Sequence, residues 1–303
     1  MKVRYGRIAL LLAGILIVSL GLTALCGVRR AQPQEGRVKV VAASYPMYTA
    51  ALRVAGDSRG VFVSCLTPPS TGCLHDHQLT PAERASLDSA DVLILNGAGA
   101  EEFLEPLLPQ LTATVVDTAK SALPHEEHHE HEHHNDHIWL DPALYAIQVK
   151  TIGEALCAAD PAGAERYRQN AAEYTAQITA VQAQLTEIAS RLAVDKAVLF
   201  HDSMAYPAAA LGLDVVGELP IGEEGGFSAA EVAEVAEAMR GQAVLLLYDD
   251  QYPQQMTQLA AYAERSITVS LNSAVMPVYG VDDAQTWLWC MEDNIQRLKE
   301  AAG

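Results

Sequence analysis

The stretch "SAAEVAEVAEAMRGQAVLLLYD" (228–249) contains an amphipathic helical pattern followed by an apolar strand pattern. Ser228 and Glu231 have the spacing of a capping box, which places the start of the helix at Ser228. The run "AVLLLYD" (243–249) is almost continuously apolar, as expected for a strand of a parallel sheet that is covered on both faces. This stretch therefore predicts an α/β fold.

Short apolar, β-branched runs of the same kind recur in two sets. The first set is 38–44, 61–66, 91–97 and 112–118, and the second is 196–200, 213–219, 243–249 and 267–272. Helical stretches such as "TPAERASLDSA" (80–90) lie between them. Alternation of strands and helices predicts two Rossmann-like α/β lobes with mainly parallel sheets and right-handed crossovers.

The segment 143–193 separates the two sets and has helical spacing of its apolar residues. Only "DPAG" (160–163) interrupts this pattern, and from Ala164 it continues for about thirty residues, roughly 45 Å of helix. A helix of this length predicts a link between the lobes, whereas two ordinary helices in one domain are the alternative. We therefore expect an N-terminal lobe (33–142), a long linking helix (143–193) and a C-terminal lobe (194–303).

The first thirty residues predict a signal peptide or a membrane anchor. Three basic residues in the first seven positions precede an uncharged apolar stretch from Ile8 to Val28. Cys26 is a candidate lipoprotein cysteine, although Leu25 stands where a small residue is usual. We therefore expect an extracytoplasmic, membrane-anchored protein, at the cell surface or in the periplasm.

Charge and cysteine content limit the possible functions further. The net charge of −18 argues against a nucleic-acid partner, because phosphates would be repelled. Cys65, Cys73, Cys157 and Cys290 allow three disulfide pairings, among them a Cys65–Cys73 link across the loop "LTPPSTG". No CxxC pair occurs, which argues against a zinc site made of cysteines.

Four histidines follow predicted strands, at the sheet edge where open α/β folds bind ligands. His75 and His77 come after the second strand, His137 after the fourth, and His201 directly after "KAVLF". Imidazole suits zinc and other borderline transition metals. His75, His137 and His201 therefore predict a metal site between the lobes. His77 is left as a ligand, as a partner of a ligand, or as an ordinary loop residue.

Six more histidines lie in the acidic stretch "HEEHHEHEHHND" (125–136). This stretch has no apolar anchor and cannot form a packed core. We expect a secondary, low-affinity zinc site or zinc sensor here, and the alternative is a solvated loop without function. Its histidines are His125, His128, His129, His131, His133 and His134.

Several longer motifs carry a family resemblance. They are "VVAASYPMYTAALRVAGD" (40–57), "ADVLILNGAGAEEFLEPLL" (90–108), "HIWLDP" (137–142), "KAVLFHDSMAYPAAALGL" (196–213) and "MEDNIQRLKEA" (291–301). The chain resembles the zinc-binding group of cluster A-I solute-binding proteins, the ZnuA/TroA-like components of metal-uptake ABC transporters. The resemblance covers nearly the whole mature chain and implies two α/β lobes joined by a long backbone helix.

The resemblance also implies the metal ligands His75, His137 and His201. Relatives with glutamate at the position of His201 tend to be manganese proteins, so the histidine here indicates zinc. The fourth ligand position departs from the family, since Asn272 replaces a frequent aspartate and Leu74 a glutamate of some zinc members. Water, His77, Asn272 or a histidine of the insertion remain as candidates.

Three neutral imidazoles and water would leave the charge of a zinc ion uncompensated. We therefore expect at least one of Asp76, Asp202 and Asp249 to accept a hydrogen bond from a ligand imidazole and to fix its tautomer.

The function that the resemblance implies is high-affinity zinc uptake, without enzymatic activity. A monomeric, membrane-tethered protein would capture Zn²⁺ between its lobes and deliver it to a membrane permease. A manganese or iron protein of the same class is the first alternative. A zinc-dependent hydrolase with Asp202 as base is the second, although the resemblance covers nearly the whole mature chain and implies a role that is not enzymatic. An adhesin role leaves no mark in the sequence.

Overall fold

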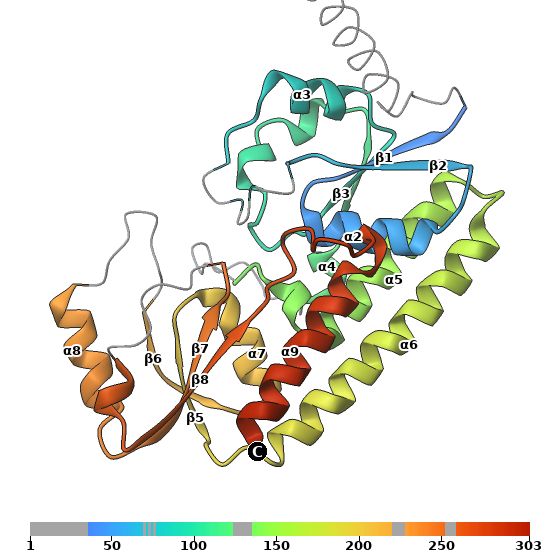
Figure 1. The fold of residues 1–303 in the computed structure, drawn as a ribbon. Coiled ribbons are helices and arrows are strands. Elements are labelled where there is room, and N and C mark those ends of the chain that lie inside the picture. Colours follow the sequence, from blue (N-terminus) through green and yellow to red (C-terminus); the bar gives the residue numbers. More distant parts are fainter. Residues whose placement is uncertain are drawn as a thin grey trace, which may run out of the picture. The chain divides into compact units, whose positions relative to one another are not determined.

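Two four-stranded parallel sheets form the framework of residues Val38–Gly303 (Figure 1). The computed structural model describes residues 36–68, 71, 74, 77–123, 135–219, 228–251 and 259–303. Met1–Arg37 form a separate unit, of which only Gly36 and Arg37 are described. The predicted export segment 1–30 thus lies outside the described residues.

All eight predicted strands form, which confirms the α/β class. The first sheet has the order β2-β1-β3-β4 and the second the order β6-β5-β7-β8, with every neighbouring pair parallel. In each sheet the order reverses beside the first strand of the lobe, where open α/β folds bind ligands. The strands are β1 (Val38–Ala42), β2 (Val61–Cys65), β3 (Val92–Leu95), β4 (Thr114–Asp117), β5 (Lys196–Leu199), β6 (Asp214–Glu218), β7 (Ala243–Asp249) and β8 (Arg265–Leu271).

Helices cover both faces of each sheet, as the apolar strands require. The capping box of Ser228 and Glu231 begins α8, and Thr80 with Glu83 makes a second one at α3. The helices are α2 (Tyr45–Ala55), α3 (Pro81–Asp88), α4 (Ala119–Ala122), α5 (Pro142–Ala159), α6 (Ala164–Ala189), α7 (Ala205–Ala210), α8 (Ala229–Ala238) and α9 (Thr286–Ala302). Short 3₁₀ helices are η1 (Glu102–Leu104), η2 (Leu108–Gln110), η3 (Ile138–Leu140), η4 (Asp202–Met204), η5 (Leu259–Tyr262) and η6 (Asp283–Gln285).

The segment 143–193, expected as the linking helix, contains the two helices α5 and α6, which pack side by side. The turn at 160–163 separates them. Helix α5 packs on α2, α4, β3 and β4 of the N-terminal lobe, whereas α6 reaches from α2 to α7 of the C-terminal lobe. At 26 residues, α6 is about 39 Å long and is the helix that links the lobes.

A second connection was not expected from the sequence, because η6 and the start of α9 pack against α2 of the first lobe (Figure 1). The Tyr45 hydroxyl donates to Asp283 Oδ1 at 2.8 Å, and the Trp287 ring stacks on Tyr145 with centroids 4.4 Å apart. Trp287 Nε1 also donates to the carbonyl of Trp139 at 3.0 Å. The chain after β8 therefore returns to the N-terminal lobe before α9 runs back.

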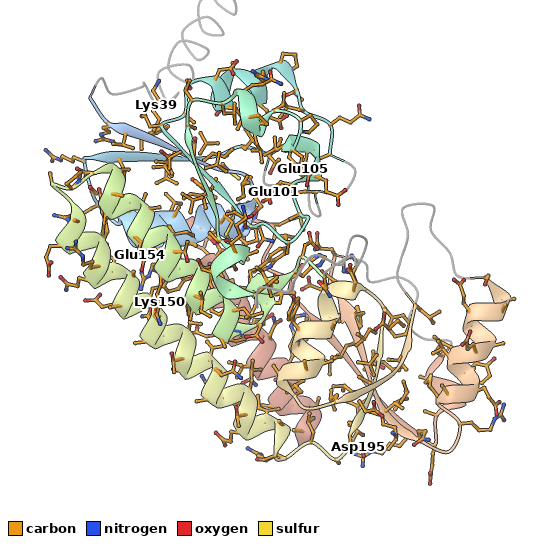
Figure 2. All side chains as sticks on the ribbon, turned by 180° about the vertical axis from the view of Figure 1, so that it is seen from behind. Lys39, Glu101, Glu105, Lys150, Glu154 and Asp195 are labelled. Carbon is orange, nitrogen blue, oxygen red and sulfur yellow. The ribbon has the colours of Figure 1, made fainter. Side chains whose placement is uncertain are left out.

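One hydrophobic core continues through both lobes along α6. Its buried side chains alternate at spacings of four and three residues, which keeps them on one face of the helix. They are Tyr167, Ala171, Tyr174, Ile178, Val181, Leu185 and Ile188. Smaller cores lie under α3 and α8, on the other faces of the sheets. Figure 2 shows Lys39, near the start of β1, and Asp195, just before β5, far apart in the two lobes.

Candidate metal site

His137 lies directly before η3 and is almost completely buried, with 1% of its side chain exposed. Ile138, Trp139 and Leu140 are buried after it and fix the loop in the core. The Trp139 ring lies 5.1 Å from the imidazole, and its Nε1 donates to the carbonyl of Ser273 at 2.8 Å. The apolar residues of "HIWLDP" thus hold this histidine between the lobes.

His201 follows β5 without a loop and begins η4. Its side chain is 11% exposed, and its Nδ1 lies 2.8 Å from the Ser203 hydroxyl. Strand β5 is buried at its carboxyl end, where Leu199 and Phe200 anchor the chain on the core. The second histidine is therefore presented at the sheet edge where the strand order reverses.

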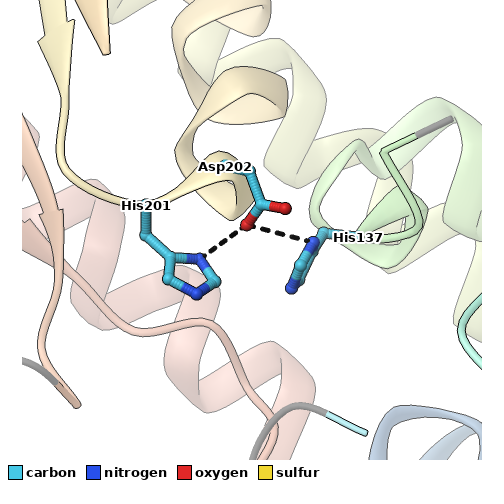
Figure 3. A group of neighbouring side chains, drawn as sticks. All are labelled: His137, His201 and Asp202. Atoms are coloured by element: carbon cyan, nitrogen blue, oxygen red, sulfur yellow. Dashed lines mark ion pairs between the residues drawn. The ribbon is translucent and has the colours of Figure 1, made fainter. Parts of the chain in front are cut away.

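The two imidazoles from opposite lobes meet edge to face, with ring centroids 5.3 Å apart. Asp202 Oδ1 lies 2.9 Å from His201 Nδ1 and 3.7 Å from His137 Nδ1. Within the described ranges, His137, His201 and Asp202 are the group whose potential ligand atoms lie within 4.8 Å of one another. Figure 3 shows both Nδ1 atoms turned towards Asp202, with the other ring nitrogens on the far side of each ring.

The carboxyl group of Asp202 is ionised at neutral pH. Burial acts to raise its pKa, but the hydrogen bond with His201 and the charge of the nearby imidazoles lower the pKa to about 2. An ionised carboxylate only accepts hydrogen bonds, whereas the backbone N–H of Ser203 donates to the same Nδ1 atom at 3.2 Å, so the two contacts favour opposite tautomers of His201. Asp202 thus lies within hydrogen-bond distance of a predicted ligand imidazole, and its role in fixing the tautomer stays a prediction.

His137 has two further acceptors that the sequence did not indicate. Asn135 Oδ1 and Asp136 Oδ1 each lie 3.0 Å from its Nδ1, and Asn135 Oδ1 also accepts the His137 backbone N–H at 3.0 Å. These acceptors favour the tautomer of His137 that carries its proton on Nδ1. Both residues directly precede His137 in the chain, but polar residues next to a histidine are too common to predict such a contact from the sequence.

A buried polar network supports this loop from below. Asn96, which follows β3, donates from Nδ2 to the carbonyl of Asp136 at 2.8 Å and accepts from Gln148 Nε2 at 3.0 Å. The Glu101 carboxylate accepts the backbone N–H groups of Asn96 and Gly97 at 2.9 and 3.0 Å. Burial raises the pKa of Glu101 to about 8, although these two N–H groups act to lower it.

The candidates for a fourth ligand make other contacts. His77 Nε2 lies 3.0 Å from Glu83 Oε1, and its ring packs against Phe103 at 5.0 Å. Asn272 Oδ1 accepts the backbone N–H of Ala274 at 2.8 Å and so supports a residue with a φ of 58°. These contacts are made with residues other than His137, His201 and Asp202.

Asp249, which we considered as an acceptor for a ligand imidazole, bonds to Gln251. Its carboxylate accepts from the backbone N–H and from the Nε2 of Gln251, at 3.0 and 3.1 Å. His75, Asp76 and the six histidines of 125–134 lie outside the described residues. The same holds for Cys26 and Cys73, whereas Cys65, Cys157 and Cys290 are free thiols, so no two of these three form a disulfide.

Comparisons with known proteins place the chain in a family. The family model described as "Zinc-uptake complex component A periplasmic" matches residues 40–301. The iron-binding protein YfeA of Yersinia pestis is 28% identical over 71% of this chain and 70% of its own length. The zinc-binding lipoprotein AdcA of Streptococcus pneumoniae is 25% identical over 97% of this chain, which spans 60% of AdcA.

The solved structures support the fold. The periplasmic zinc-binding protein TroA of Treponema pallidum matches with a TM-score of 0.71 and 21% identity, over 88% of this chain and 100% of that one. The predicted fold and the family resemblance are thus both confirmed. Among the described residues, no helix has the length and apolar character needed to cross a membrane.

Proposed function

Because the chain belongs to the family of periplasmic zinc-uptake components, whose model covers residues 40–301, we propose that it is the substrate-binding protein of an ABC transporter for high-affinity zinc uptake. In this role it captures Zn²⁺ between its two lobes, outside the cytoplasm, and delivers the ion to a membrane permease. The lipoprotein AdcA supports a membrane tether, for which Cys26 is the candidate here.

The observation that carries the proposal is the meeting of His137 and His201. Each imidazole comes from a different lobe, and Asp202 and Asp136 lie 2.9 and 3.0 Å from the Nδ1 atoms of His201 and His137. Two imidazoles would supply half of the ligands of a tetrahedral zinc site, and the neighbouring carboxylates would offset part of the metal charge. We propose His75 as the third ligand. The fourth position stays open to water, His77, Asn272 or a histidine of 125–134.

Zinc is proposed over manganese and iron because the two imidazoles dominate the described group. Nitrogen donors suit zinc, whereas manganese prefers more oxygen donors. A carboxylate at Asp202 would serve manganese or iron if it bound the ion directly, and YfeA carries an iron-binding name. In our proposal Asp202 remains occupied with the two imidazoles instead.

Competition titration of the metal-free protein tests the proposal. With a fluorescent chelator, we expect one tight zinc ion per chain and much weaker binding of Mn²⁺ and Fe²⁺. His137→Ala and His201→Ala should each abolish the tight site. Asp214→Asn is the control, because this exposed carboxylate pairs with Lys196 and is none of the candidate ligands. A preference for manganese over zinc, or tight binding that survives in His201→Ala, would refute the zinc site.

A hydrolase is the remaining alternative, because three histidines and a water molecule also describe a catalytic zinc site. In our proposal Asp202 is no general base, since its carboxylate lies 2.9 Å from the His201 imidazole. Turnover of a generic ester or amide by the zinc-loaded protein, lost in Asp202→Asn, would favour the enzyme instead.

A further inference from the structure

Asn135 connects the two lobes next to the candidate metal site. Its Nδ2 donates to the backbone carbonyl of Asp202 at 2.6 Å, and its own carbonyl accepts the Tyr206 hydroxyl at 2.8 Å. Its Oδ1 accepts the backbone N–H of His137 at 3.0 Å. One residue of the N-terminal lobe is thus bound to both the His137 loop and the His201 loop.

Tyr206 contributes more than its hydroxyl. It lies in α7 of the C-terminal lobe, yet its ring packs against a cluster of Ala119, Ala122 and Ile138 in the N-terminal lobe. Burial raises the pKa of Tyr206 to about 12, so the hydroxyl stays protonated and donates at physiological pH. The bond from its hydroxyl to Asn135 and the packing of its ring on this cluster both cross the interface between the lobes.

We propose that Asn135 and Tyr206 are positioning residues for the metal, acting through an interlobe bridge. We use this term for the two hydrogen bonds from Asn135 to Asp202 and from Tyr206 to Asn135. The bridge holds His137 and His201 at ligand spacing before the ion arrives. This inference rests on the proposed function, since it concerns the same site.

The bridge should act on the rates of metal exchange. A metal ion held between two loops leaves when the loops separate, and this separation breaks both hydrogen bonds of the bridge. Removing one bond therefore lowers the free energy needed for separation and speeds dissociation. Association passes through the same separated state, so its rate constant should rise together with that of dissociation.

The test compares Tyr206→Phe and Asn135→Ala with the full-length wild type. Zinc dissociation into excess chelator and zinc association are both measured by stopped flow. We expect Tyr206→Phe to raise the dissociation rate constant about two- to tenfold, the range of one neutral hydrogen bond, with a similar rise in the association rate constant. Asn135→Ala should have a larger effect, because it also removes the acceptor of the His137 N–H.

Tyr167→Phe is the matched control for the loss of a tyrosine hydroxyl. Tyr167 donates to Asp160 at 2.6 Å, and its hydroxyl lies 2.8 Å from that of Ser58. Neither contact involves the C-terminal lobe. We expect Tyr167→Phe to lower the melting temperature at least as much as Tyr206→Phe and to leave zinc dissociation unchanged. A structural role of Tyr206 alone would give both variants the same kinetics.

The outcomes separate the two proposals. If wild type binds zinc tightly and Tyr206→Phe and Asn135→Ala release it at the wild-type rate, the bridge is refuted and the proposed function stands. Equal acceleration in Tyr167→Phe refutes the bridge as well. If wild type binds no zinc tightly, the proposed function fails, and the bridge fails with it.

Discussion

Asp202 lies between the two proposed ligand imidazoles, and its carboxylate is closest to the ring of His201. Because this carboxylate lies 2.9 Å from His201 Nδ1, Asp202→Asn should loosen the orientation of the ring and reduce its basicity. We expect zinc affinity to fall about 10- to 100-fold, as for other residues that support metal ligands. Competition titration measures the change.

The control for this prediction is Asp214→Asn, at the opposite end of the second sheet. Asp214 is 71% exposed and pairs with Lys196 at 3.1 Å, so its loss should leave zinc affinity unchanged. Wild-type affinity in Asp202→Asn would mean that His201 needs no carboxylate to orient it.

A second prediction at the residue scale concerns pH. Imidazoles bind metal only when neutral, and they ordinarily titrate near pH 6.5, so zinc capture should weaken below about pH 6. Asp202 does not cause this loss, because its lowered pKa of about 2 keeps it ionised over the same range. Zinc titrations at pH 5 and pH 7.5 measure the effect, and equal affinities would count against a histidine site.

The turn after β3 carries the prediction at the scale of an element. Burial raises the pKa of Glu101 to about 8, above its ordinary value of 4.5, so between these values the folded state holds a proton that the unfolded state has lost. The stabilising contribution is therefore complete below pH 4.5 and is lost as the pH rises through 8. The loss is up to about 1.4 kcal/mol of unfolding free energy per pH unit.

Urea unfolding of the metal-free protein at pH 5, 7 and 9 tests this sign. Glu101→Gln cannot titrate, so the difference between wild type and variant isolates the contribution of Glu101 from that of other groups. The variant should be less stable overall, since one backbone N–H loses its acceptor. Parallel pH dependences for the two proteins would show that Glu101 has an ordinary pKa.

Helix α6 supports a packing prediction. Ile178 is fully buried in the stripe that continues the core from one lobe to the other, and Ile178→Ala should cost about 2–5 kcal/mol of unfolding free energy. The adjacent Thr179 is exposed, so Thr179→Ala should change the unfolding free energy by no more than about 0.5 kcal/mol. Equal urea midpoints for the two variants would place the core elsewhere.

The elements themselves could be predicted from local patterns, whereas their contacts could not. Uninterrupted apolar runs indicated every strand, and His201 was placed at a strand end because it directly follows one of these runs. The supporting residues Asn96, Glu101 and Asn135 carry no such signal, because a polar residue after a strand is ordinary until the fold brings it to a partner. The return of η6 to α2 likewise depends on tertiary contacts such as Tyr45 with Asp283.

At the scale of the whole unit Val38–Gly303, two connections oppose a wide opening of the lobes. One is α6, and the other is the segment after β8, held by the stacked pair Tyr145 and Trp287. Hinge closure of the kind seen in other two-domain binding proteins needs connections that bend easily. We therefore expect metal exchange to proceed by small movements of the His137 and His201 loops.

The histidine-rich stretch 125–134 provides the last prediction, which concerns the capacity of the whole chain for zinc. We expect it to bind additional zinc weakly, because its sequence of histidines and acidic residues contains no apolar residue that could fix a packed geometry. Replacing all six histidines by serine should lower the number of zinc ions bound at high concentration and leave the tight ion in place. Substitution is preferable to deletion, because it keeps the chain before Asn135, which bonds to Asp202, at its full length. Calorimetric titration measures both classes of site, and loss of the tight ion in this variant would show that a histidine from the stretch supplies the missing fourth ligand.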